Sequence, residues 1–284
     1  MFYLFLSIFF SVCIFFAFKS FSRFRINILS AITTNYLVAT SFGFLSSFRS
    51  DGLIAYWHQP WFAMASVTGI AFIVTFFVFA VSTQKVGVAM TVVSSKMSIV
   101  ISVVVGFVLL SEPYNLIKIA GIIAALLAFY FSTRSRNDFQ IEKKYLFLPI
   151  VIFLGTGAND SLMKLSGVYF ENRDEIQFLT VTFFIAFLIG FTVLVFRLFH
   201  KSITITWRDI FAGVLLGLIN WGSTYFFIKG LFVLPISFFI PVFNASLVVI
   251  AALAGFFFLE EKLARINWIG IVLAVVSIAA IAFS

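Results

Sequence analysis

Two charged residues lie inside long apolar stretches of the sequence, where a charge is costly and usually has a function. Lys96 lies in VVSSKMSIV, near the middle of the apolar run 86–110, and Asp160 lies in GTGANDSLMK, inside the run 145–167. A lysine at the centre of a membrane helix costs about 2.5–3.5 kcal/mol, and such a residue usually faces the bundle interior. We expect Lys96 to hold an anionic group, such as a carboxylate or phosphate. A static ion pair, or a side chain that reaches the membrane surface, is the alternative.

Asp160 has two interpretations of equal weight. It lies four residues before Lys164, so the two side chains can pair on one helical face and lower each other's insertion cost. Alternatively, Asp160 binds the ammonium group of a solute or exchanges a proton with it. The neighbouring Asn159, together with Gly155 and Gly157, predicts a helix that loosens here and exposes backbone groups to a cavity.

A stripe of small polar residues runs along the same helix as Lys96. Thr91, Ser95, Ser98 and Ser102 recur at helical spacing, and Lys96 points away from them at 3.6 residues per turn. The stripe is therefore predicted to be a surface for close helix packing rather than part of the lysine's pocket.

Aromatic and amide side chains in the run 208–230 are further candidates for contact with a solute. Trp221 and Tyr225 share a stripe that ends at Lys229. Aromatic belts form at membrane surfaces, but Trp221 lies too deep in its run for one, so we expect the two rings to line a binding cavity. Lys229 is predicted to lie at the membrane surface. Asn220 belongs to a neighbouring stripe that favours packing, and we include it as a polar candidate.

The run 234–259 contains a proline close to another amide. Asn244 follows Pro241 by three residues. Proline removes one helical hydrogen bond and frees a carbonyl one turn upstream, here near Ser237. We expect a hinge at Pro241, with Asn244 as a candidate binding residue beside it.

The composition requires a membrane environment. Hydrophobic residues make up 62% of the 284 residues and charged residues 11%, whereas soluble proteins carry roughly 25% charged residues. The apolar runs have the length that a helix needs to cross a bilayer, and no strand-like alternation is present. The sequence therefore predicts an all-α integral membrane protein whose surroundings are the lipid bilayer. The net charge of +8 comes from basic residues scattered in short loops, which indicates membrane topology rather than nucleic-acid binding.

A doubled motif shows that the chain consists of two related halves. Residues 106–121 read GFVLLSEPYNLIKIAG and residues 255–270 read GFFFLEEKLARINWIG, at an offset of 149. Ten apolar runs can be placed, roughly at 2–18, 27–47, 60–82, 86–110, 114–133, 145–167, 176–199, 208–230, 234–259 and 264–283. We therefore predict ten transmembrane helices in two five-helix repeats, 1–133 and 145–284, joined by a polar linker at 134–144. Five is an odd number, so the second repeat must be inverted relative to the first.

The glutamates of the doubled motif are predicted to have structural roles. Glu112 and Glu261 fall in the loops between paired helices, where they would cap backbone groups or pair with basic residues. Lysine and arginine concentrate in the odd-numbered loops, and this bias predicts that those loops are cytoplasmic and that both termini lie outside.

The repeated Gly-x5-Glu-x8-Gly pattern resembles the drug/metabolite transporter superfamily, in particular its EamA-like branch of ten-helix transporters. Pro241 matches a proline usual in that helix, and GTGANDSLMK resembles a stretch of the small multidrug resistance branch. Val92 stands at the first-repeat equivalent of Pro241, and Thr156 stands where the small multidrug carriers have an essential carboxylate. The resemblance implies export of small metabolites such as amino acids across the cell's inner membrane, by exchange or coupled to protons. It also implies cytoplasmic termini, opposite to the charge-based prediction.

The sequence is compatible with three classes of function. The first is a secondary transporter in which Lys96 and Asp160 bind a zwitterionic or acidic metabolite; a proton-coupled exporter of lipophilic cations is the alternative. The second is an enzyme, which the absence of HExxH and GxSxG motifs disfavours. A non-transporting scaffold or receptor is the third. No GxxxxGK[ST] motif is present, so we expect no nucleotide, and we expect no metal or other cofactor. A homodimer is one candidate assembly.

Overall fold

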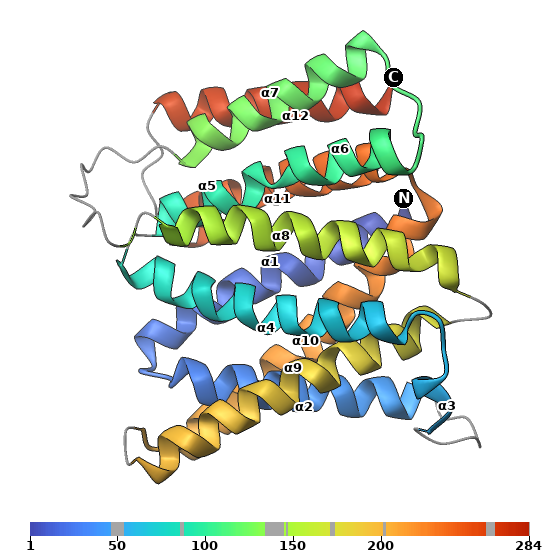
Figure 1. The fold of residues 1–284 in the computed structure, drawn as a ribbon. Coiled ribbons are helices and arrows are strands. Elements are labelled where there is room, and N and C mark those ends of the chain that lie inside the picture. The colour runs from blue at the N-terminus through green and yellow to red at the C-terminus, as the bar shows by residue number, and fades with distance from the viewer. Residues whose placement is uncertain are drawn as a thin grey trace. The chain divides into compact units, whose positions relative to one another are not determined.

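A computed structural model describes residues 1–46, 54–85, 88–133, 145, 147–170, 174–200, 203–259 and 265–283 of the chain (Figure 1). These residues form helices and no strand, as predicted. The long helices are α1 (Phe2–Arg23), α2 (Ile28–Ser46), α4 (Phe62–Lys85), α5 (Val88–Met97), α6 (Ile99–Leu109), α7 (Leu116–Thr133), α8 (Phe147–Ser166), α9 (Asp174–Phe199), α10 (Trp207–Val233), α11 (Ile236–Leu259) and α12 (Arg265–Ala282). A short α3 (Ile54–Trp57) and a 3-10 turn, η2 (Gly167–Tyr169), complete the described elements.

Each predicted apolar run coincides with a helix, except that the fourth is two helices. The run 86–110 was predicted as one helix, but α5 ends at Met97 and α6 begins at Ile99. The hydroxyl of Ser98 donates to the carbonyl of Ser95 at 2.6 Å, and the N–H of Ile101 donates to the Ser98 carbonyl at 2.9 Å. A serine that bonds to the preceding turn often bends a helix slightly. The backbone of Ser98 keeps helical angles, with φ −58° and ψ −14°, so the interruption is small.

Four helices are long and apolar enough to cross a membrane by length and composition: Ile28–Ser46, Phe62–Phe79, Asp174–Phe199 and Trp207–Val233. Shorter apolar helical stretches lie at Phe2–Ile14, Ser94–Leu109, Leu116–Ala128, Ile236–Leu247 and Trp268–Ile281. The helices therefore have the composition of a multi-pass membrane protein.

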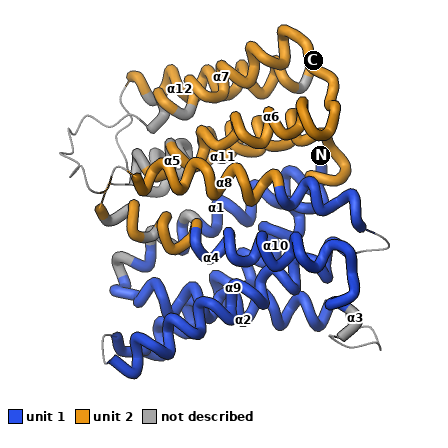
Figure 2. Tube along the Cα trace, in the orientation of Figure 1, with its two compact units in different colours: residues 1–74, 162–230 blue, residues 75–161, 231–284 orange. Residues whose placement is uncertain are grey.

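The described chain forms two compact units, which Figure 2 colours separately. Unit 1 comprises residues 1–74 and 162–230, and unit 2 comprises residues 75–161 and 231–284. Each unit therefore takes segments from both halves of the sequence. The predicted linker 134–144 lies outside the described residues.

In unit 1, α2 packs antiparallel against α9, and glycines allow the close approach. A Cβ atom on Gly43 would lie 2.3 Å from the hydroxyl of Thr180, and one on Gly190 would lie 3.2 Å from the hydroxyl of Thr33. Gly43, near the end of α2, thus lies against Thr180, near the start of α9, as antiparallel packing requires. Close packing through small residues is the usual means of helix association in membranes.

In unit 2, α7 packs along α12 in the same antiparallel manner (Figure 1). A Cβ atom on Gly121, near the start of α7, would lie 2.7 Å from Ile281, near the end of α12. The alanines Ala128, Ala245 and Ala274 form a buried cluster that joins α7, α11 and α12. The offset of 149 carries α7 onto α12, since 116 + 149 = 265 and 133 + 149 = 282, so the predicted repeat pairs these two helices.

Candidate functional site

The side chain of Lys96 reaches from α5 to α11. Its Nζ donates a hydrogen bond of 2.9 Å to Oδ1 of Asn244 and lies 5.8 Å from the ring centre of Phe243. Asn244 is buried, whereas Lys96 is half-buried. A lysine over an aromatic face within about 6 Å gains a cation–π interaction. Two of the residues predicted from the sequence, Lys96 and Asn244, are thus in direct contact.

Asp160 supplies the opposite charge. Its carboxylate in α8 interacts electrostatically with Lys96, and the buried side chain of Ser102 in α6 lies beside it. One turn earlier on α8, Thr156 shares a hydrogen bond of 3.4 Å with Ser95 of α5. Lys96, Asp160, Asn244, Ser102 and Phe243 therefore form one group of side chains, which we call the Lys96 cluster. Ser102, which was predicted to serve only packing, therefore also belongs to the cluster.

The face of α8 next to Asp160 packs against α4 and α6. A Cβ atom on Gly155 would lie 2.4 Å from the hydroxyl of Thr75, and one on Gly157 would lie 2.7 Å from the side chain of Ile101. Since α8 runs through both glycines without interruption, the helix does not loosen there, and the prediction of an opened helix is wrong. The two glycines instead allow α8 to approach its neighbours closely.

Asn159 lies on this α4-facing side and not in the Lys96 cluster. Its Nδ2 donates to the hydroxyl of Thr75 at 3.5 Å, a long hydrogen bond. Its Oδ1 is buried and has no hydrogen-bond partner among the described residues. Because one turn separates Gly155 from Asn159, both face α4, whereas Thr156 and Asp160 face α5.

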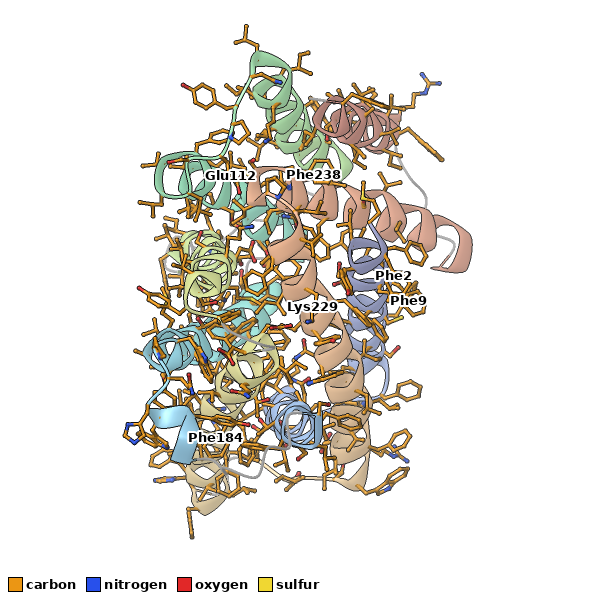
Figure 3. The ribbon with its side chains drawn as sticks, turned by 90° about the vertical axis from the view of Figure 1, so that its right-hand side faces the viewer. Phe2, Phe9, Glu112, Phe184, Lys229 and Phe238 are labelled. Atoms are coloured by element: carbon orange, nitrogen blue, oxygen red, sulfur yellow. The ribbon has the colours of Figure 1, made fainter. Side chains whose placement is uncertain are left out.

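Glu112 caps the first turn of α11 (Figure 3). Its carboxylate accepts hydrogen bonds from the backbone N–H groups of Ile236 at 2.7 Å and Ser237 at 2.9 Å. A Cβ atom on Gly106 would lie 2.5 Å from the side chain of Ile236 and 3.0 Å from the Glu112 carboxylate. The spacing from glycine to glutamate in the doubled motif is thus explained in its first copy. Pro241 lies one turn further along α11 and is buried, while Glu261 lies outside the described residues.

The aromatic candidates belong to unit 1. The rings of Trp221 and Tyr225 stack with their centres 5.1 Å apart and their planes at 3°. Lys229, labelled in Figure 3, lies 5.8 Å from the ring centre of Tyr225 and forms an ion pair with Glu175 at the start of α9. Asn220 accepts a long hydrogen bond of 3.5 Å from Thr224 within α10.

Sequence reasoning missed Glu175 and Phe243 as neighbours of the predicted lysines. Glu175 is separated from Lys229 by 54 positions, and Phe243 is one of 42 phenylalanines. A pattern along one helix cannot pair residues on different helices, so neither contact has a local signal. The one available indication was the position of Glu175 at the start of a long apolar run.

The apolar helices, together with two charges held inside them, define a multi-pass membrane protein in contact with lipid and with small solutes. Residues 144–283 match the EamA-like transporter family, and this match supports the assignment of the chain to the drug/metabolite transporter superfamily, as its sequence resemblance predicted. The family is one of transporters rather than of enzymes.

Two further proteins are similar over nearly their whole length. The chain is 21% identical over 268 residues to an uncharacterised protein of Haemophilus influenzae, covering 89% of this chain and 88% of that protein. A crystal structure of another protein shares the fold with a TM-score of 0.76 at 15% identity, covering 98% of this chain and 94% of that chain.

Proposed function

We propose that this protein is a secondary transporter that exports small metabolites such as amino acids, with the Lys96 cluster as its solute site. The observation that carries the proposal is the contact of Lys96 with Asn244 next to Asp160. Both charges lie within helical segments of a membrane protein, and charges in such positions usually mark a substrate or ion path.

The cluster favours a solute that carries both charges. Removing one of two opposite charges inside a membrane helix bundle leaves the other charge uncompensated, which is unfavourable. The carboxylate of a zwitterion can replace Asn244 as the acceptor for Lys96 while its ammonium group approaches Asp160. Neither protein charge then loses its compensation. An acidic metabolite can also provide a carboxylate as the acceptor for Lys96. Its additional negative charge is balanced if it moves with a proton or in exchange for a second solute. Coupling to a proton or to a counter-substrate is therefore part of the proposal.

The packing of repeat-equivalent helices supports an inverted repeat of ten spans. The offset of 149 relates α2 to α9 and α7 to α12, and both pairs pack antiparallel. Inverted halves run in opposite directions through the membrane, so equivalent helices that meet must be antiparallel. We accordingly propose alternating access between the repeats, in the inner membrane and with both termini outside.

Within unit 1, the stacked pair Trp221 and Tyr225 is proposed to contact apolar parts of a transported solute, with Asn220 as an accessory polar group. Aromatic side chains offer large apolar contact area with few rotatable bonds. The chemistry of transport proposed here needs no cofactor.

Transport into proteoliposomes tests the proposal. We expect uptake of radiolabelled L-leucine or L-glutamate by the wild type and its loss in Lys96→Met. The matched control is Lys85→Met, which removes an exposed lysine at the end of α4 and should transport normally. Normal uptake by Lys96→Met would overturn the assignment of the site.

The same vesicles distinguish the alternative of a lipophilic-cation exporter. That function requires a carboxylate free to hold a cation, whereas Asp160 already interacts electrostatically with Lys96. We expect no uptake of tetraphenylphosphonium driven by a proton gradient. Uptake that persists in Lys96→Met and disappears in Asp160→Asn would favour the alternative.

A further inference from the structure

We infer that Glu112 is a positioning residue for the Lys96 cluster, acting through α11. Its carboxylate fixes the start of the helix that presents Asn244 to Lys96. The inference concerns this proposed solute site and so rests on the proposed function, but its structural part can be measured without any solute.

The cap is well suited to hold a helix inside a membrane. The first N–H groups of a helix have no partner within it, and such groups are costly where water is excluded. Glu112 satisfies two of them with its two oxygens, at 2.7 and 2.9 Å from the nitrogens of Ile236 and Ser237. A negative charge at a helix N-terminus is also favoured by the helix dipole.

The loop that carries Glu112 is built to keep the carboxylate in place. Ser111 has a φ of 50°, in the left-handed region, which reverses the chain at the end of α6. The N–H of Glu112 then donates to the carbonyl of Gly106 at 3.1 Å. Since a side chain on Gly106 would collide with Ile236, α6 and the start of α11 are in direct contact at this point.

The cap and the Lys96 cluster lie on the same helix and on either side of Pro241. Ile236 and Asn244 are eight residues apart, a distance of about 12 Å at 1.5 Å per residue. Pro241 removes one of the hydrogen bonds between these two points. The first turn of α11 is thus held less by its own helix, and its orientation depends more on Glu112. Glu112 binds α11 on the N-terminal side of Pro241, and Lys96 binds it on the C-terminal side through Asn244.

The test combines Glu112→Gln with Asn244→Ala in the full-length protein. Glutamine has nearly the size of glutamate but offers one acceptor, so one N–H of α11 loses its partner. We expect Glu112→Gln to weaken the affinity for the transported amino acid by about threefold to thirtyfold, the range for residues that act through a network. The maximal rate at saturating solute should change less. With Asn244→Ala already present, Glu112→Gln should have no further effect on affinity.

Melting temperatures in detergent provide the measurement that needs no solute. Each single variant should lower the melting temperature, and the double variant should lower it by about 2–4 °C less than the sum, since residues coupled through one element are not additive. Amide exchange at Ile236 and Ser237 should become faster in Glu112→Gln.

Asp209→Asn is the matched control, because Asp209 also caps backbone groups. Asp209 is buried in unit 1 and accepts from the N–H groups of Asn27 and Thr206, both at 2.7 Å. Its loss should lower stability and leave solute affinity unchanged. Additive effects of Glu112→Gln and Asn244→Ala, or an equal loss of affinity in Asp209→Asn, would reduce Glu112 to a stabilising cap and overturn the inference. Normal transport by Lys96→Met would instead overturn the proposed function, whether or not Glu112 and Asn244 are coupled.

Discussion

The two units differ in where their helices carry charge. In unit 1, the charged residues of the described long helices all lie within five residues of a helix end: Lys19, Arg23, Lys164, Asp174, Glu175, Arg197, Arg208, Asp209 and Lys229. In unit 2, Asp160 is seven residues from the end of α8, both residues included. Lys96 is one residue before the end of α5, but α6 begins at Ile99, so Lys96 lies near the middle of the combined helical stretch 88–109. Helix ends are close to water or to unpaired backbone groups, so charge is tolerated there, whereas a charge in the interior is costly.

The difference indicates which unit carries the chemistry. Asp209 compensates its charge with the backbone of the α10 start, and Glu175 does so with Lys229. Both arrangements stabilise helix ends and need no solute. The Lys96 cluster instead holds a cation and an anion among side chains, and a solute can take the place of those side-chain partners. We therefore propose that unit 2 recognises the solute by charge.

The largest expected effect is the loss of one interior charge. Lys96→Met removes the cation that interacts with Asp160. Breaking a fully buried pair typically costs about 3–5 kcal/mol, and because both side chains are half-buried we expect a loss near the lower end of this range. The double variant Lys96→Met, Asp160→Leu should recover most of this loss, because two apolar side chains need no compensation. Unfolding in a denaturing detergent, followed by circular dichroism, measures the difference in stability between the variants.

The comparison between units makes this prediction specific. Lys229→Met also leaves a glutamate without its lysine, but Glu175 lies at the start of α9, where the helix end offers other partners. A loss of stability in Lys229→Met as large as that in Lys96→Met would contradict the distinction between end and interior charges. So would a double variant of Lys96 and Asp160 that is less stable than either single one.

Much of the fold and part of the site could be predicted from the sequence, because both depend on local pattern. The apolar runs coincide with the helices to within a few residues, since run length and hydropathy are local properties. Trp221 and Tyr225 were assigned to one stripe from their spacing of four, and their rings stack. Lys96 and Asp160 stand out because a charge is rare within an apolar run.

The rest of the site depends on contacts between distant segments. Asn244 is 148 residues from Lys96, and no pattern along the chain indicates that they meet. The sequence predicts that Glu112 caps backbone groups, because glutamates in loops often do so. It does not predict which groups are capped, since Ile236 on α11 is 124 residues away. The interruption at Ser98 was missed for another reason, since a serine bonded to its own helix has no distinct sequence signal. The glycines of α8 were interpreted as flexibility, and their neighbours Thr75 and Ile101 show that they serve packing.

A smaller effect is expected from filling the close contacts between helices. Gly155→Ala would bring a methyl group 2.4 Å from the hydroxyl of Thr75 in unit 2, whereas Gly190→Ala would place one 3.2 Å from Thr33 in unit 1. Overpacking typically costs about 1–3 kcal/mol, and we expect Gly155→Ala to fall in this range and Gly190→Ala below it. Since α8 carries Asp160, Gly155→Ala should also weaken solute uptake. Equal stability of the two variants would show that Thr75 moves aside at no cost.

The smallest effect is expected from the ion pair of Glu175 and Lys229. The side chain of Lys229 is 23% exposed and that of Glu175 is 11% exposed, so solvent and salt screen part of their attraction. A double-mutant cycle with Glu175→Gln and Lys229→Met should give a coupling of about 1 kcal/mol or less, the usual range for ion pairs near a surface. The coupling should decrease at high salt, and the affinity for the transported solute should change far less than in Lys96→Met. A coupling that is large and independent of salt, accompanied by loss of uptake, would instead place a second charge-dependent step in unit 1 and remove the division of roles between the units.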